Sequence, residues 1–158
     1  MAAYAEKTSV SAERTQAEIS ETVRKYGAEG YMSGWEGNQA MIAFRARGRQ
    51  VRFVLTLPER GDAQFSHTET GRVRTDRAAV EKAWDQEVRR RWRALGLCIK
   101  AKLEAVESGI ASFDEEFMAH LVLADNTTVG ERVLAELDAA PANSTPPRLL
   151  AIGGPSAQ

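Results

Sequence analysis

Cysteine and histidine are scarce in this sequence, and their scarcity excludes several kinds of site. Cys98 is the single cysteine among 158 residues, which excludes an internal disulfide framework and a zinc site built from several cysteines. We expect Cys98 to be buried as a small hydrophobic residue. The two histidines, His67 and His120, lack neighbours that would complete a metal site or a catalytic group. The sequence therefore predicts no metal, no cofactor and a reducing compartment such as the cytoplasm.

Long hydrophobic runs are absent as well. No apolar stretch approaches the ~18 residues that a membrane span requires, and the first residues lack the apolar segment of a secretory signal. The glycines of residues 27–37 match neither the Walker phosphate loop nor the dinucleotide-binding fingerprint. Carboxylates occur without a pairing that predicts general acid–base chemistry. We therefore expect a protein that contacts no membrane and is not an enzyme.

The first half of the chain predicts one helix followed by three strands. Residues 11–26 carry apolar side chains at helical spacing, with a serine available as the N-cap and Gly27 just past the end. Residues 39–47 and 50–57 then alternate between apolar and polar side chains, as strands do, and Gly48-Arg49 marks a tight turn between them. Residues 30–35 come before these two strands, are followed by a further turn, and supply one more strand. We expect a three-stranded antiparallel meander.

The second half predicts a long central helix and a small helical cap. Apolar residues recur every three or four positions from Asp76 to Gly109, whereas the preceding residues 59–74 have no such period and indicate a polar loop. At 1.5 Å per residue this helix is about 50 Å long, and a small sheet cannot cover an apolar stripe of that length. We therefore expect either a kink near Gly96 or burial of one end against a second copy in a homo-oligomer.

Beyond the long helix, Ser112 and Glu115 fit a capping box that starts a short helix, and residues 121–123 form a short strand. Thr128 can cap a last helix, which would bury Val133, Leu134 and Leu137. The whole is an α+β fold in a single domain over residues 1–140, followed by a proline-rich and mobile C-terminal tail, residues 141–158.

Charge is distributed unevenly along the chain, although the net charge is only −1. Residues 45–102 hold 15 basic and 7 acidic side chains, whereas residues 103–158 hold 2 basic and 9 acidic ones. Such asymmetry is typical of proteins that bind an anionic partner, or of charges that pair within or between copies of a chain. Both interpretations remain open from the sequence alone.

A nucleic-acid surface is the first interpretation of the basic segment. Arginine forks match phosphate geometry, and aromatic rings stack on unpaired bases, so a basic sheet face beside a basic helix would form a groove for a single strand. The candidate contacts are Arg45, Arg47, Arg49, Arg52, Arg72, Arg74, Arg89, Arg90, Arg93, Trp35 and Tyr31. Trp84 and Trp92 belong to the apolar stripe of the long helix, and we expect them in the core.

Three segments resemble a family of small proteins encoded by bacteriophages and prophages. They read AYAEKTSVSAERTQAEI, WEGNQAMIAFRARGRQVRFVL and WRALGLCIKAKLEAVESGIASFDEEFMAHLVL, and the resemblance spans most of residues 2–137. The family has no assigned activity, so the resemblance implies a phage origin and the host cytoplasm but no catalytic residues. The order of three strands and a long helix is also similar to the core of Rad52-like annealing proteins, by analogy of topology alone.

Two functions follow from these patterns. The first is non-enzymatic binding of nucleic acid, with single-stranded DNA favoured, in phage replication, recombination or genome protection. The second is an interaction protein that blocks or sequesters a host factor, as in anti-defence, through an oligomeric surface. The partner is accordingly either nucleic acid or a host protein.

Overall fold

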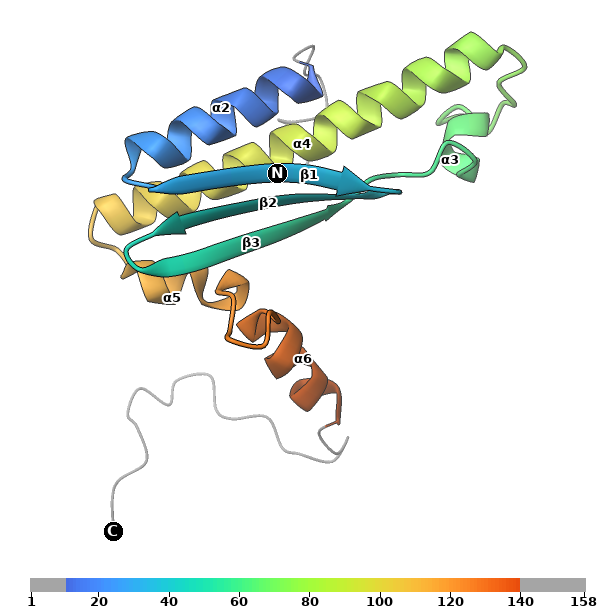
Figure 1. The fold of residues 1–158 in the computed structure, drawn as a ribbon. Coiled ribbons are helices and arrows are strands. Elements are labelled where there is room, and N and C mark those ends of the chain that lie inside the picture. The colour runs from blue at the N-terminus through green and yellow to red at the C-terminus, as the bar shows by residue number, and fades with distance from the viewer. Residues whose placement is uncertain (1–10, 140–158) are drawn as a thin grey trace.

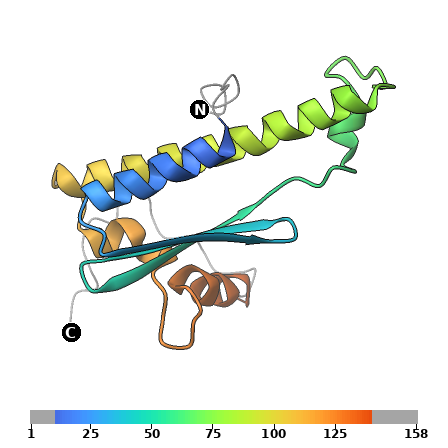
Figure 2. The same ribbon diagram turned by 45° about the horizontal axis from the view of Figure 1, so that its top comes forward.

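A computed structural model describes residues 11–139 of the chain, and it has the expected α+β architecture (Figure 1). Two helices, α2 and α4, lie side by side on one face of a three-stranded antiparallel sheet, and α6 lies on the other side of the sheet (Figures 1 and 2). The expected tail at residues 141–158 lies outside the described residues.

Helix α2 (Ala12–Lys25) forms where the sequence pattern places it. The Ser11 side chain accepts a hydrogen bond from the backbone N–H of Arg14, which satisfies one of the free donors of the first turn. Gly27 follows the helix with a φ of +94°, a conformation that residues with a Cβ rarely adopt. Ile19 and Val23 are buried and attach this helix to the core.

The sheet has the order β1-β2-β3, with β1 (Gly30–Glu36), β2 (Gln39–Ala46) and β3 (Arg49–Thr56) joined by two-residue loops. The second loop consists of Arg47 and Gly48, with φ values of +52° and +73°, and not of Gly48 and Arg49 as expected. A hairpin loop of this type needs positive φ at both positions, so Arg47 leaves the strand and Arg49 joins the next one.

The register defines two faces of the sheet. The inner face carries the buried residues Ile42, Phe44 and Phe53, and it packs against α2 and α4. The outer face carries Arg52 and other residues that occupy every second position of the three strands. These other residues are Met32, Gly34, Met41, Ala43, Arg45 and Val54.

Helix α4 (Arg77–Glu107) is one helix, capped by Asp76, and it runs past Gly96 without a break (Figure 1). Gly96 does not kink the helix and lies against α2, where a Cβ would be 3.4 Å from the Thr15 side chain, an ordinary contact distance. Trp92 is buried, as expected, while Trp84 is only partly covered. The Trp84 ring donates a hydrogen bond to the carbonyl of Pro58 and supports the Arg60 guanidinium 3.7 Å above it.

The polar segment before α4 is more ordered than its sequence indicates. It contains the short helix α3 (Ala63–Ser66), whose Phe65 is buried, and an isolated bridge between His67 and Val73. The Phe65 side chain and the contact of Arg60 with Trp84 attach the segment to α4. A single residue has no period, which is why the sequence pattern indicated only a loop.

After α4 the chain forms α5 (Phe113–Phe117), η1 (Met118–His120) and α6 (Val129–Ala139). The capping box of Ser112 and Glu115 is present as expected. Phe117 is fully buried, with its ring edge-on to Phe44 at 5.8 Å, so α5 closes the lower end of the core. The expected strand at residues 121–123 is reduced to isolated bridges, including that between Val51 and Leu121 on the edge of β3.

Candidate functional site

The hairpin arginines are held by contacts within the chain. Arg49 donates two hydrogen bonds to the Asp114 carboxylate, at 3.1 and 2.8 Å. This contact lowers the pKa of Asp114, because the guanidinium hydrogen bond stabilises the charged carboxylate. Arg47 lies over the Phe113 ring, and Arg45 is 3.9 Å from Glu29. Arg49 and Arg47 are therefore already engaged by neighbouring groups, whereas the Arg45 side chain is 64% exposed and is held only loosely.

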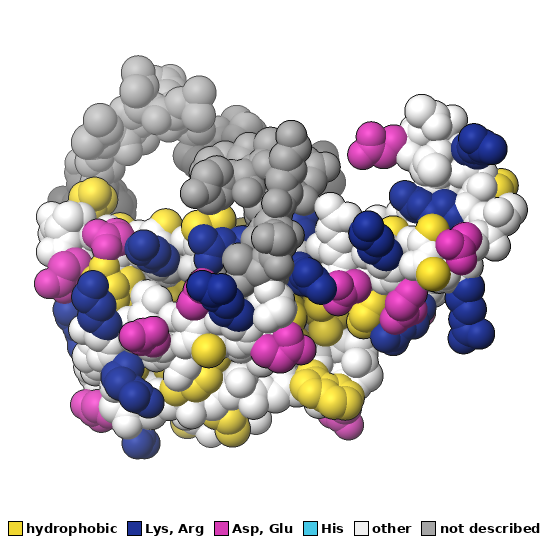
Figure 3. All heavy atoms as spheres, turned by 90° about the horizontal axis from the view of Figure 1, so that it is seen from above, with side chains coloured by type: hydrophobic (Ala, Val, Ile, Leu, Met, Phe, Trp, Pro, Cys, Tyr) yellow, Lys and Arg dark blue, Asp and Glu magenta, His cyan; other side chains and the backbone are white. Residues whose placement is uncertain are grey.

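The arginines of α4 are paired in the same way. Arg90 forms a two-pronged contact with Glu87, and its hydrogen bonds lower the pKa of that carboxylate. Arg93 contacts Glu18 of α2 at 2.9 Å, and Arg89 contacts Asp85 at 2.6 Å. Where Figure 3 shows the described residues of this face, basic and acidic side chains are consequently mixed.

Arg72 and Arg74 belong to the segment around α3, at the far end of α4 (Figure 1). The Arg74 guanidinium donates to the backbone carbonyls of Gln64, Phe65 and His67, so it fixes the shape of the loop. Arg72 is exposed. Both lie far along the molecule from the hairpin arginines.

The aromatic candidates do not share a face with Arg45 and Arg52, the two arginines on the outer face of the sheet. Tyr31 pairs with Phe44 and Trp35 pairs with Ala40, so both lie on the inner face, whereas Arg45 belongs to the outer face. Trp35 is nevertheless 81% exposed, because it stands near the end of the hairpin. The predicted nucleic-acid contacts therefore do not share one face of the molecule, although Arg74 and Arg90 line the same hollow beside α3.

The other chemically active side chains have ordinary structural contacts, with one exception. Glu116 binds Lys102, and His120 stacks on Phe53 with ring centroids 4.0 Å apart. Burial lowers the pKa of His120. Cys98 is exposed, which contradicts its expected burial, because it lies on the side of α4 that turns away from α2 and the sheet. No group of three potential metal ligands occurs within residues 11–139.

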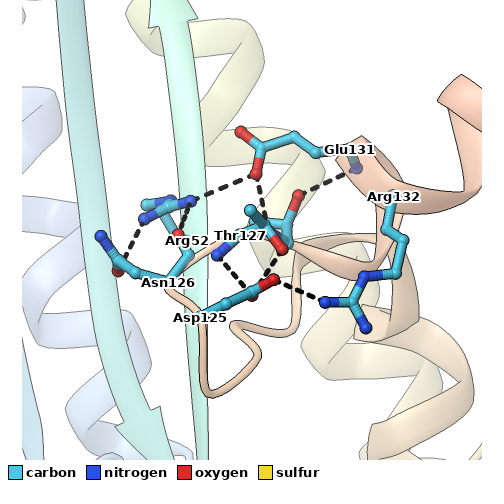
Figure 4. A network of polar contacts seen from close by, with 7 residues as sticks. Arg52, Asp125, Asn126, Thr127, Glu131 and Arg132 are labelled. Carbon is cyan, nitrogen blue, oxygen red and sulfur yellow. Dashed lines mark hydrogen bonds and ion pairs between the residues drawn. The ribbon is translucent and has the colours of Figure 1, made fainter.

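The best-defined polar cluster of the structure joins α6 to the outer face of the sheet (Figure 4). The Arg52 guanidinium donates to the side-chain and backbone oxygens of Asn126 at 3.1 and 2.8 Å and contacts Glu131 at 3.3 Å. Only 14% of the Arg52 side chain is exposed. Glu131 also accepts from the backbone of Thr128, whose hydroxyl accepts in return, so the predicted cap of α6 is a capping box.

Asp125 organises the turn that leads into α6. It accepts hydrogen bonds from the hydroxyl and the backbone N–H of Thr127 and contacts Arg132 (Figure 4). These donors, the Thr127 hydroxyl first, lower the pKa of Asp125 from 3.8 to about 2. Asn126 takes a φ of +66° in this turn, a conformation that Asn tolerates better than most residues. The contacts of Asp125, before the helix, with Thr127 and Arg132 therefore fix the start of α6.

The apolar face of α6 is exposed, which corrects the expectation that it is buried. Val133, Leu134 and Leu137 are 43%, 59% and 62% exposed, and within the described part of the chain nothing covers them. The helix contacts η1 through its first turn, where Gly130 lies against Ala119, so its remaining turns extend away from the core. We call these three side chains the α6 surface. The amphipathic pattern located the surface but could not show that it faces outward.

No protein-family model, curated protein or solved structure matches this chain. Among the helices of residues 11–139, none combines the length and the apolar composition that crossing a membrane requires.

Proposed function

We propose that this chain is a non-enzymatic interaction protein that binds a protein partner through the α6 surface. The observation that carries the proposal is the exposure of Val133, Leu134 and Leu137 on one side of a short helix. Fully burying an exposed Leu or Val side chain is favourable by about 1.5–3 kcal/mol, and a groove that covers these three gains the part of this that corresponds to their exposed surface. An amphipathic helix laid in an apolar groove is a recurring mode of recognition.

The polar contacts of Arg52 with Asn126 and Glu131, which we call the Arg52 cluster, support this function because they hold the helix ready for binding. The cluster fixes the first turn of α6 through Asn126 and Glu131 and leaves the later turns free of the core (Figure 4). A helix that is already formed and oriented loses less conformational entropy on binding than a disordered segment does. In the phage setting that the sequence resemblance implies, the partner is a host protein that the chain blocks or sequesters.

Charged substitutions on the α6 surface test this proposal. Leu134→Glu and Leu137→Glu together should abolish capture of the partner from a bacterial lysate, because a carboxylate in an apolar groove is strongly unfavourable. The matched control is Ala135→Glu with Ala139→Glu, which adds the same two charges on the opposite side of the helix and should preserve capture. Circular dichroism would verify that all variants fold. Equal capture by the wild type and the double variant would contradict the proposal.

Single-stranded nucleic acid is a second candidate ligand, favoured by one observation. The Trp35 indole is 81% exposed and could stack on an unpaired base. Trp35→Ala should then remove the electrophoretic shift of an oligonucleotide. Arg45→Ala with Arg47→Ala should flatten the salt dependence of the affinity by up to about two units. A folded protein that causes no shift at low salt would exclude this candidate.

A further inference from the structure

Strand β1 forms an open edge of the sheet. In the described residues it pairs with β2 alone, and none of the isolated bridges involves it. Edge strands of native proteins are usually protected by proline, by lysine or by bulges, since free backbone groups invite pairing with another chain. Within β1 the one charged residue is Glu36, and both Met32 and Trp35 are mostly exposed, at 56% and 81%. This edge has almost none of the usual protection.

The register of β1 determines which residues offer backbone groups at the edge. Glu36 and Gln39 flank a two-residue loop, so their backbone groups face each other. Antiparallel pairing alternates along a strand, which turns the N–H and C=O groups of Tyr31, Ser33 and Trp35 outward. A second β1 can therefore pair in antiparallel orientation with Ser33 opposite Ser33 and with Tyr31 opposite Trp35.

The side chains of β1 are complementary to themselves in this register. On the inner face Trp35 of one copy would lie opposite Tyr31 of the other, an aromatic cross-strand pair. On the outer face Met32 would lie opposite Gly34, where a Cβ would find no atom within 4 Å and a long side chain has room. Both exposed apolar side chains of the strand would thus be covered by the second copy.

Charges at the ends of β1 match in the same register. Glu36 of one copy would lie opposite Gly30 of the other, and Gly30 has no side chain. The Arg45 guanidinium of the neighbouring strand extends over this glycine, 3.9 Å from the position that a Cβ would take. The Glu36 carboxylate would therefore meet Arg45 across the new strand pair, and the two-fold symmetry would form this ion pair twice.

We propose that two copies of the chain pair through β1, centred on Ser33, to form a continuous six-stranded sheet. This interface differs from the long helix, which the sequence pattern had suggested for self-association, and from the α6 surface. Covering Trp35 and Met32 supplies apolar burial, and the pairs between Glu36 and Arg45 fix the register.

Reciprocal charge reversal tests the proposal on the full chain. The wild type should have a mass of twice 17.4 kDa by analytical ultracentrifugation at high protein concentration. Glu36→Arg alone places two arginines at each contact, and Arg45→Glu alone places two glutamates there. Each variant should weaken dimerisation about tenfold or more. An equal mixture of the two variants restores both contacts, so heterodimers should form with near wild-type affinity.

Two further variants separate the backbone contribution from folding. Ser33→Pro removes an N–H that faces the open edge, so the sheet within each chain should persist while the dimer is lost. Ser33→Ala keeps the N–H and should dimerise normally. The proposal would be overturned by a wild-type mass of 17.4 kDa at all concentrations, or by a mixture of the charge variants that stays monomeric although both are folded.

Discussion

At the scale of single residues, Asp125 shows how one exposed carboxylate can link the position of an element to pH. Its folded pKa is about 2, below its ordinary value of 3.8, because Thr127 and Arg132 stabilise the charged form. A group with a lowered folded pKa stabilises the fold above its unfolded pKa, and this contribution is lost as the pH falls through the folded value. Stability should therefore decline between about pH 4 and pH 2.

The measurement is the midpoint of thermal unfolding by circular dichroism from about pH 6 to pH 2. Asp125→Asn cannot titrate, so its midpoint should fall less steeply in acid than that of the wild type, and it should be lower near neutral pH. Asp138→Asn makes the same charge change at the far end of α6 and should follow the wild-type curve. Identical curves for the wild type and Asp125→Asn would show that the Thr127 and Arg132 contacts do not matter.

At the scale of an element, the attachment of α6 depends on the absence of a side chain. In an exposed helix, Gly→Ala is normally favourable by about 1 kcal/mol. Gly130 should behave in the opposite way, because its Cβ would lie 2.7 Å from the Ala119 carbonyl oxygen, a backbone atom that cannot move alone. We expect Gly130→Ala to loosen α6 at a cost of about 1–3 kcal/mol. Denaturant unfolding and hydrogen exchange of α6 would measure this loss.

The control for Gly130→Ala is Gly61→Ala, since a Cβ at Gly61 would meet no atom within 4 Å. That variant should change stability by no more than about 0.5 kcal/mol. Gly130→Ala with wild-type stability and wild-type exchange in α6 would mean that the helix shifts freely against η1. In that case the Arg52 cluster alone would hold it.

At the scale of the whole molecule, stability is expected to be uneven. The C-terminal half of α4 holds the buried residues Ile99 and Leu103 and packs against α2, while α6 has no buried side chain. Elements with few buried contacts open locally at low free energy. Amides of α6 should therefore exchange with deuterium well before those of β2 and of residues 95–107. Similar exchange rates in α6 and in the core of α4 would contradict this expectation.

The sequence predicted the elements better than the surfaces. Caps, glycines and apolar spacing located α2, α4, α6 and the three strands, because these signals are local in the chain. Exposure of Cys98 and of Leu134 could not be predicted, since it depends on which face of a helix meets a distant element. The partners of Arg49 and Arg52 are likewise remote in sequence, although the charge counts indicated that such pairs were one of two possibilities.

The ion pairs between the basic central segment and its acidic flanks have a consequence for evolution. Arg49 binds Asp114, Arg93 binds Glu18 and Lys102 binds Glu116, and each pair joins residues far apart in the chain. Loss of one partner leaves a charge without its counterpart, so replacement at one position favours a compensating replacement at the other. In an alignment of related sequences, the two positions of each pair should therefore co-vary: either both charges change sign or both charges are lost.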